Sequence, residues 1–121
     1  MRNISLAVIE SYDLIRCAFS RQLRDIGFNV IIEAENGDDF IEKAGTTAIP
    51  GLCILGIDTI LIEEFMTAIR IKARYPDIKI IAYTLFEKDY DNGECGIDIF
   101  IPKKCSIEEL KSIVLQLMMF D

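Results

Sequence analysis

Two hydrophobic periods alternate along the chain and predict a regular succession of strands and helices. Short runs that are apolar throughout predict buried strands at residues 4–9, 29–34, 52–55, 79–83 and 97–101. Apolar residues at helical spacing predict helices at residues 12–26, 38–44, 62–75 and 106–120. Strands that are apolar on both faces favour a parallel sheet covered by helices on both sides. We therefore predict an α/β, doubly wound five-stranded parallel sheet, a (βα)5 flavodoxin-like fold.

Local signals mark where the predicted helices begin and end. Gly27 ends the first helix, whose apolar residues are spaced to line one face: Leu14, Ile15, Ala18, Phe19, Leu23 and Ile26. Pro76 ends the third helix, and Ser106 with Glu109 forms a capping box at the start of the last one. Residues 86–96 are mostly polar with little apolar spacing, so we predict a shortened or irregular fourth helix there.

Length and charge narrow the possible functions. A chain of 121 residues, 51% of them hydrophobic, suits a single globular domain over residues 1–121. Its formal charge of −7 repels phosphate backbones and anionic lipids, so we expect no direct nucleic-acid or membrane binding. The apolar runs are too short for a membrane span, and residues 1–3 lead directly into a strand-like segment, which favours a cytoplasmic protein.

The available side chains argue against most hydrolase mechanisms. The chain has no histidine, which removes histidine-based general bases, Ser-His-Asp and Cys-His pairs, and imidazole metal ligands. The four cysteines are scattered without a CxxC pair and are expected to be free thiols: Cys17, Cys53, Cys95 and Cys105. We predict a protein that is not an enzyme and has no cofactor or metal. In parallel sheets, ligands bind beyond the carboxyl ends of the strands, which directs attention to residues 9–13, 56–62, 84–87 and 102–105.

Three segments of the chain carry a resemblance to a known family. Residues 68–84 look like the third helix, fourth strand and terminal switch threonine of response-regulator receiver domains, without gaps. Residues 35–37 resemble the second β–α turn of these domains, and residues 103–110 resemble their final loop and helix. The order and spacing of these segments are similar to the CheY-like superfamily, in particular to NarL/FixJ-type receivers, over nearly the whole chain. The resemblance implies the receiver fold and a place in two-component signalling.

The resemblance also implies a site, and the sequence departs from it. Family members accept a phosphoryl group from a kinase histidine on an aspartate at the end of strand three, with magnesium held partly by two acids after strand one. Counting from Pro50 places Gly56 at the acceptor position. Only Glu10 stands where the family has two carboxylates. The resemblance therefore indicates a degenerate receiver that lacks the phosphoacceptor and binds magnesium poorly.

Other positions of the implied site retain family residue types. Thr84 stands at the switch hydroxyl, Phe100 at the switch aromatic, and Lys103 at the phosphate-contacting lysine. Without a phosphoryl group we favour plainer roles: Thr84 ends a strand, Phe100 packs, and Lys103 is a solvated cation. Asp58 could be a displaced acceptor, completing a remnant acid pocket with Glu10, but the register favours an exposed loop acid.

Three functions remain open. We favour a pseudo-receiver that binds a protein partner or forms a homodimer, independently of phosphorylation, through helix one (residues 14–26), helix five (residues 107–120) or residues 86–96. Residues 117–120 support this hypothesis, because one helix face cannot bury four consecutive large apolar side chains. The alternative is a working phosphorelay receiver that uses Asp58 or Glu10. A flavodoxin-like nucleotide or flavin binder is disfavoured, since the acidic residues 10–13 replace a glycine-rich phosphate loop.

Overall fold

A five-stranded parallel sheet forms the centre of the molecule. The computed structural model describes residues 4–57, 62–84 and 96–119. The strands are β1 (Ser5–Ile9), β2 (Asn29–Ala34), β3 (Leu52–Ile57), β4 (Lys79–Thr84) and β5 (Ile99–Pro102), in the order β2-β1-β3-β4-β5. Every neighbouring pair is parallel. The predicted α/β sheet is confirmed, and β3 is its central strand.

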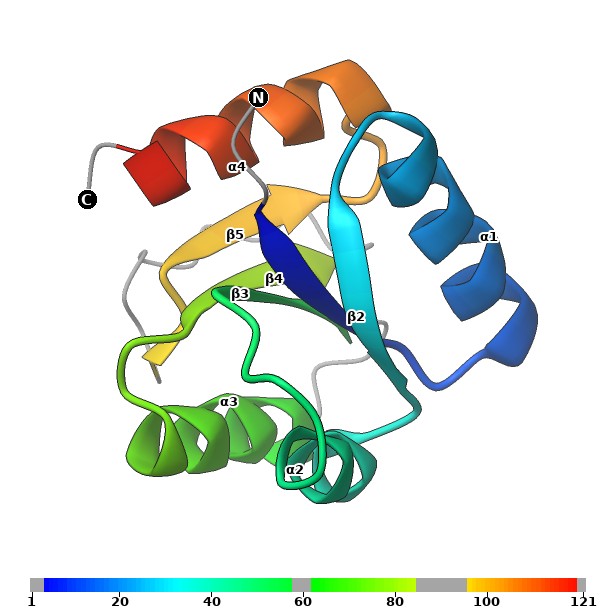
Figure 1. Ribbon diagram of the computed structural model, residues 1–121. Helices are drawn as coiled ribbons and strands as arrows, with labels where there is room; N and C mark the ends of the chain where they lie inside the picture. The colour runs from blue at the N-terminus through cyan, green and yellow to red at the C-terminus, as the bar shows by residue number, and fades with distance from the viewer. Residues whose placement is uncertain (1–3, 58–61, 85–95, 120–121) are drawn as a thin grey trace.

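Helices cover both faces of the sheet. In the described part of the chain they are α1 (Asp13–Asp25), α2 (Gly37–Ala44), α3 (Ile62–Arg74) and α4 (Ile107–Met119). Figure 1 shows α1 and α4 on one face and α2 and α3 on the other. This is the predicted doubly wound arrangement. The predicted fourth helix falls on residues 86–96, which lie outside the described residues apart from Gly96.

Two hydrophobic cores lie between the helices and the sheet. Side chains alternate along each strand, so Leu52 and Ile54 pack with Leu23 of α1 and Val114 of α4. The intervening residues pack on the opposite face, in a core that includes Cys53 and Leu55 of β3, Phe40 of α2 and Ile71 of α3. This two-sided burial explains why the strands read as continuous apolar runs.

Helix ends follow the predicted signals in part. Gly27 follows α1 with a positive φ of 105°, a conformation that glycine adopts without strain. The Ser106 hydroxyl accepts a hydrogen bond from the Glu109 N–H at 3.1 Å, which confirms the serine half of the predicted capping box. The Glu109 carboxylate instead contacts the Cys105 thiol at 3.8 Å. At α2, Asn36 caps the helix by accepting from the Asp39 N–H at 2.8 Å.

The apolar face predicted for α1 is only partly buried. Leu23 is fully buried, but Leu14 is 86% exposed and Ile15 is 50% exposed. Helical spacing groups these residues on one face, yet Leu14 and Ile15 in the first turn of α1 remain exposed. The face that the spacing predicts is therefore buried at Leu23 but exposed at the start of the helix.

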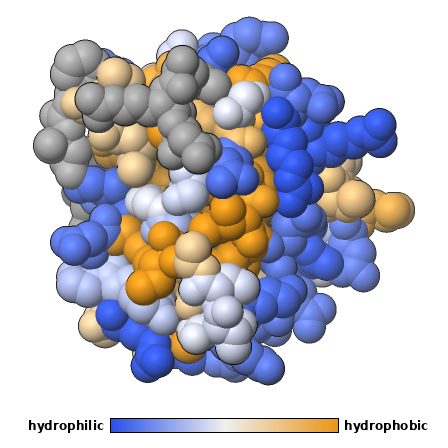
Figure 2. Space-filling model, viewed as in Figure 1, coloured by the Kyte–Doolittle hydropathy of each residue, from blue (hydrophilic) through white to orange (hydrophobic). Residues whose placement is uncertain are grey.

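A hollow lies at the amino edge of the sheet. At the amino ends of β3 and β4, Ile49, Pro50, Tyr75 and Ile78 line a hollow of about 370 Å³. The space-filling view shows apolar side chains gathered near the centre of the visible face, bordered by hydrophilic ones (Figure 2). The sequence-predicted site residues lie at the opposite edge.

Across the described residues, no helix has the length and apolar character needed to cross a membrane.

Candidate functional site

The predicted site residues meet at the carboxyl edge of the sheet. Glu10 directly follows β1, Gly56 is the next-to-last residue of β3, Thr84 ends β4, and Lys103 follows β5. Gly56 is paired with Tyr83, and Thr84 with Pro102, so the three strands end close to one another. The parallel sheet thus brings together side chains that are up to 93 positions apart in the sequence.

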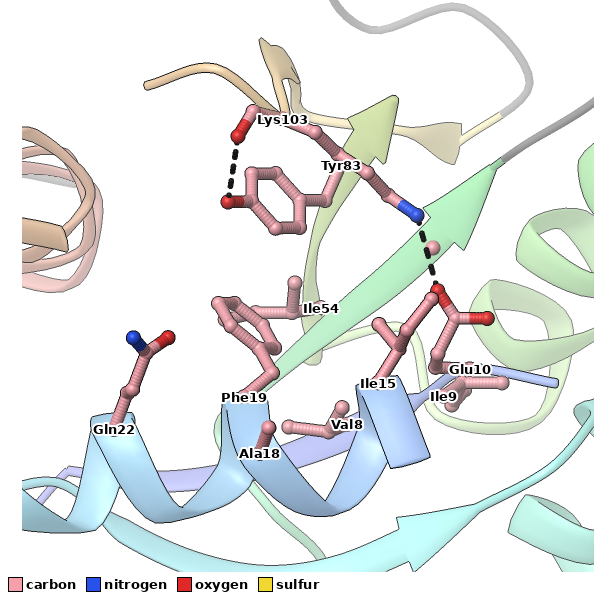
Figure 3. A pocket seen from close by; sticks show the side chains of 11 residues that line it. Val8, Ile9, Glu10, Ile15, Ala18, Phe19, Gln22, Ile54, Tyr83 and Lys103 are labelled. Atoms are coloured by element: carbon pink, nitrogen blue, oxygen red, sulfur yellow. Dashed lines mark hydrogen bonds and ion pairs between the residues drawn. The ribbon is translucent and has the colours of Figure 1, made fainter. Parts of the chain in front are cut away.

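A buried ion pair joins two of these residues. The Lys103 ammonium lies 3.0 Å from Glu10 Oε1, and the two side chains are only 12% and 5% exposed. The second Glu10 oxygen, Oε2, accepts from the Tyr12 N–H at 3.2 Å and from the Ser11 hydroxyl at 3.4 Å. Both oxygens of this carboxylate therefore have donors, of which Figure 3 shows the Lys103 ammonium. The expectation that Lys103 is a solvated cation is wrong, since its side chain is buried.

Gly56 supplies the space that this ion pair occupies. A Cβ atom added at Gly56 would lie 2.7 Å from Glu10 Oε1 and 3.2 Å from Glu10 Cδ. Contacts this short are not tolerated, so any larger residue at position 56 requires the Glu10 carboxyl to move. The Glu10 carboxylate thus fills the space beside β3 into which a side chain at position 56 would extend.

The two predicted switch residues pack as ordinary parts of the sheet. Thr84 ends β4 as expected, is 4% exposed, and its carbonyl accepts from the Lys103 N–H at 2.7 Å. Phe100 of β5 is half-buried and lies against Phe65 of α3, with ring centroids 6.4 Å apart. Phe100 thus packs against α3 in this structure.

Tyr83 is a site residue that the sequence reasoning missed. Its hydroxyl donates to the Lys103 carbonyl at 3.1 Å, and the Lys103 ammonium lies 5.9 Å from the centre of its ring. Burial raises the pKa of Tyr83, and the Cys105 thiol adds to this effect while Lys103 opposes it. The phenol therefore stays protonated at neutral pH. The available signal was the strand period, which points Tyr83 to the same face as its neighbour Gly56.

The loop after β1 is held in place by an arginine of α1. The Arg16 guanidinium donates to the Glu10 carbonyl at 2.7 Å and to Asp13 Oδ1 at 2.7 Å. These bonds fix the backbone of Glu10 relative to the first turn of α1. The Glu10 side chain is consequently aimed at Lys103 by both its own carboxylate bonds and its anchored backbone.

Two cavities flank Glu10 and Gly56. One, of about 280 Å³, lies between α1 and the sheet, and its walls are mainly apolar: Val8, Ile15, Ala18, Phe19, Ile54 and Tyr83 (Figure 3). The other, of about 180 Å³, lies towards α2 and has a more polar lining that includes Ser11, Glu35, Asn36 and Thr67. The carboxyl edge therefore offers an apolar space and a polar space, separated by one buried carboxylate.

The described residues do not suit a magnesium ion. Magnesium prefers several oxygen ligands in octahedral geometry. In the described part of the chain no group of three or more acidic, cysteine or histidine side chains could hold a metal. Glu10, the predicted ligand, is already neutralised by the Lys103 ammonium. Asp58, the other member of the predicted acid pocket, lies outside the described residues.

Sequence comparison relates the chain to response regulators. No protein-family model matches it. The response regulator GacA of Pseudomonas protegens is 30% identical over 87 residues, which cover 71% of this chain and 40% of that protein. GacA of Pseudomonas viridiflava is 29% identical over the same length. The chain thus matches about 40% of the length of these curated relatives.

Solved structures share the fold. The signal receiver domain of NarL from Mycobacterium tuberculosis superposes with a TM-score of 0.81 at 18% identity, over 97% of each chain. The response regulator TrrA of Thermotoga maritima, solved with Mg²⁺ and a beryllium fluoride, has a TM-score of 0.77 at 27% identity, covering 94% of this chain and 98% of that one. These similarities confirm the predicted flavodoxin-like receiver fold and support the predicted resemblance to receiver domains.

Proposed function

We propose, from its receiver fold and its similarity to response regulators, that this chain is an atypical receiver domain of a two-component-type protein that acts without phosphorylation. In this proposal residues 1–121 form one domain whose role is binding rather than catalysis. The observation that carries the proposal is the Glu10–Lys103 ion pair beside Gly56. A carboxylate already occupies the space in which a receiver would carry its acceptor.

The ion pair gives this proposal a physical basis. Lys103 is the residue that the family resemblance assigns to the phosphoryl oxygens, and here its ammonium contacts Glu10 at 3.0 Å. Because both side chains are nine-tenths buried or nearly so, water screens the pair weakly. The positive charge that would respond to a phosphoryl group is therefore satisfied within the chain. We infer that the domain is held in one state by Glu10.

Phosphorylation is tested most directly by mass spectrometry. The purified domain is incubated with acetyl phosphate and magnesium, and its intact mass is measured. We expect no gain of a phosphoryl group, because position 56 has no side chain and Glu10 is paired with Lys103. The alternative, a phosphorelay receiver that uses Asp58 or Glu10, predicts a gain that is lost in Asp58→Asn or in Glu10→Gln. A gain of mass that is lost in either variant would overturn the proposal.

We further propose that the domain forms a homodimer through the first turn of α1. Leu14 is 86% exposed, Tyr12 is 58% exposed and Ile15 is 50% exposed, so large hydrophobic side chains are exposed at three of the positions 12–15. Apolar clusters of this kind often mark contact surfaces. At the end of α4, Met119 is 47% exposed while Leu117 and Met118 pack against the core. Helix α1 therefore offers the stronger apolar surface, and residues 86–95 lie outside the described residues.

Oligomeric state tests this surface. Light scattering coupled to size exclusion is expected to give a dimer mass that Leu14→Glu reduces to the monomer mass. Met66→Glu is the matched control, since Met66 is a 48% exposed apolar residue on a different helix, α3. A monomer mass for the unmodified chain at all concentrations, or equal effects of the two variants, would exclude the α1 dimer.

A further inference from the structure

We propose that the apolar cavity between α1 and the sheet binds a small, uncharged, bicyclic aromatic molecule. This inference goes beyond the proposed function, because it does not depend on whether the domain accepts a phosphoryl group. The cavity lies beside the Glu10–Lys103 pair, and its lining comes from β1, α1, β3, β4 and the residue after β5. A molecule bound there would contact five parts of the fold at once.

The size of the cavity sets the size of the ligand. Its volume is about 280 Å³. A buried apolar cavity of about 150 Å³ is enough to bind benzene, so the present space suits a two-ring compound. It is at the lower end of the volumes usual for small-molecule sites, which excludes large cofactors such as dinucleotides.

The walls favour a flat aromatic body. Phe19 of α1 and Tyr83 of β4 are stacked, with ring centroids 4.9 Å apart and planes inclined by 19°. Figure 3 shows these two rings and Ile54 of β3 converging on the same space. Aromatic rings interact favourably at centroid separations of about 4.5–7 Å, so the exposed surfaces of this pair suit a third ring.

The polar groups favour an uncharged ligand. Glu10 and Lys103 lie at one end of the cavity and neutralise each other, while the Gln22 amide lies at the other end (Figure 3). An ionised ligand would lose its hydration beside apolar walls without an unpaired opposite charge to compensate. A hydroxyl or carbonyl group can instead exchange hydrogen bonds with the Gln22 amide or with the ion pair. The ligand class is therefore a neutral aromatic with one or two polar substituents.

The cavity also connects the ligand to the Glu10–Lys103 ion pair. Tyr83 forms part of the wall and donates its hydroxyl hydrogen bond to the Lys103 carbonyl. Lys103 in turn pairs with Glu10. A ligand in this cavity would thus lie beside Lys103, the residue that the family resemblance assigns to the phosphoryl oxygens. Ligand binding would therefore act on this site without phosphorylation of an aspartate.

Binding is tested with 2-naphthol as the probe, followed by ¹H–¹⁵N correlation spectra of the labelled domain. We expect saturable shifts at the amides of Val8, Ala18 and Tyr83, with a Kd of about 1 mM or tighter. The anion 2-naphthoate and the cation 2-naphthylmethylammonium should bind at least about tenfold more weakly. No saturable shift at these amides would overturn the site, and equal binding of the charged analogues would overturn the ligand class.

Two variants and a matched control separate site binding from surface adsorption. Ala18→Leu places a larger side chain in the cavity from an exposed helix position, and it should weaken 2-naphthol binding at least about tenfold. Gln22→Trp should act in the same way from the other end. Ala73→Leu makes the first change at an exposed position of α3 and should leave the affinity unaltered. Unaltered affinity in both cavity variants would overturn the proposal.

Discussion

At the scale of single residues, the Glu10–Lys103 pair consists of two charged side chains that are largely buried. Removing one member of a buried pair leaves the other as an uncompensated charge, which typically costs about 3–5 kcal/mol. We therefore expect Lys103→Met to lower the free energy of unfolding by about 3 kcal/mol, because Glu10 is 5% exposed. The double variant Glu10→Gln with Lys103→Met should lose less than the sum of the single changes. Urea denaturation of the four proteins measures this coupling.

An exposed pair provides the control. Arg70 and Asp38 form an ion pair at 2.6 Å, with side chains 47% and 80% exposed. Exposed pairs of this kind contribute about 0–1 kcal/mol, so Arg70→Met should cause a small loss. A similar small loss in Lys103→Met would show that the Glu10–Lys103 pair contributes little to stability and would contradict the proposal that Glu10 holds the domain in one state.

The effect of substituting Gly56 on the stability of the domain should depend on the side chain at position 10. Gly56→Ala places a Cβ 2.7 Å from Glu10 Oε1, so the carboxyl must leave its position opposite Lys103. We expect this change to destabilise the domain by about 1–3 kcal/mol. In a Glu10→Ala background the obstructing carboxyl is gone, and the same change should cost little. Thermal or urea unfolding measures the stability lost on Gly56→Ala in the unmodified protein and in Glu10→Ala. An equal loss in the two backgrounds would contradict the steric explanation.

At the scale of the helices, two serines should have opposite effects on stability. In the described part of the chain, the Ser20 hydroxyl on α1 is buried without a hydrogen-bond partner. Ser20→Ala removes this desolvated polar group and should stabilise the domain by about 1 kcal/mol. Ser106 instead caps α4 through the Glu109 N–H, so Ser106→Ala should destabilise it by about 1 kcal/mol. Shifts of the urea midpoint in the same direction would contradict one of the two assignments.

The helices and strands were predictable where burial is two-sided and local signals are strong. Strand β2 and the start of β4 lie where their apolar runs predict them. Strand β3 continues to Ile57, two residues beyond its predicted end, because Gly56 and Ile57 pair with Tyr83 and Thr84 of β4, which compensates for the weak strand preference of Gly56. The exposure of Leu14 could not be predicted, because helical spacing identifies a face but not how much of that face other elements cover.

The site was predictable in its location but not in its contacts. The strand order and the rule that ligands bind beyond parallel strands brought Glu10, Gly56, Thr84 and Lys103 to one edge. The ion pair itself was missed, because the resemblance assigns Glu10 to a metal and Lys103 to a phosphoryl group. Only the three-dimensional structure reveals that the space beside Gly56 lets these residues contact each other.

At the scale of the whole molecule, the ion pair links the end of β1 to the loop after β5 across the two strands between them. The two edges of the sheet should therefore respond differently when the pair is broken. At the carboxyl edge, the Lys103 N–H donates to the Thr84 carbonyl at 2.7 Å. At the amino edge, the Lys79 N–H donates to the Gly51 carbonyl at 3.1 Å and lies far along the strands from Glu10.

Native-state hydrogen exchange can distinguish local from global loosening. In Glu10→Gln, the Lys103 amide should exchange at least about tenfold faster than in the unmodified protein, because the loop after β5 loses its ionic anchor. The Lys79 amide should change only by the loss of global stability measured in urea. The difference between the two amides isolates the edge that Glu10 holds. Equal acceleration at both amides would mean that the ion pair stabilises the fold as a whole, and that the carboxyl edge is not a separately held unit.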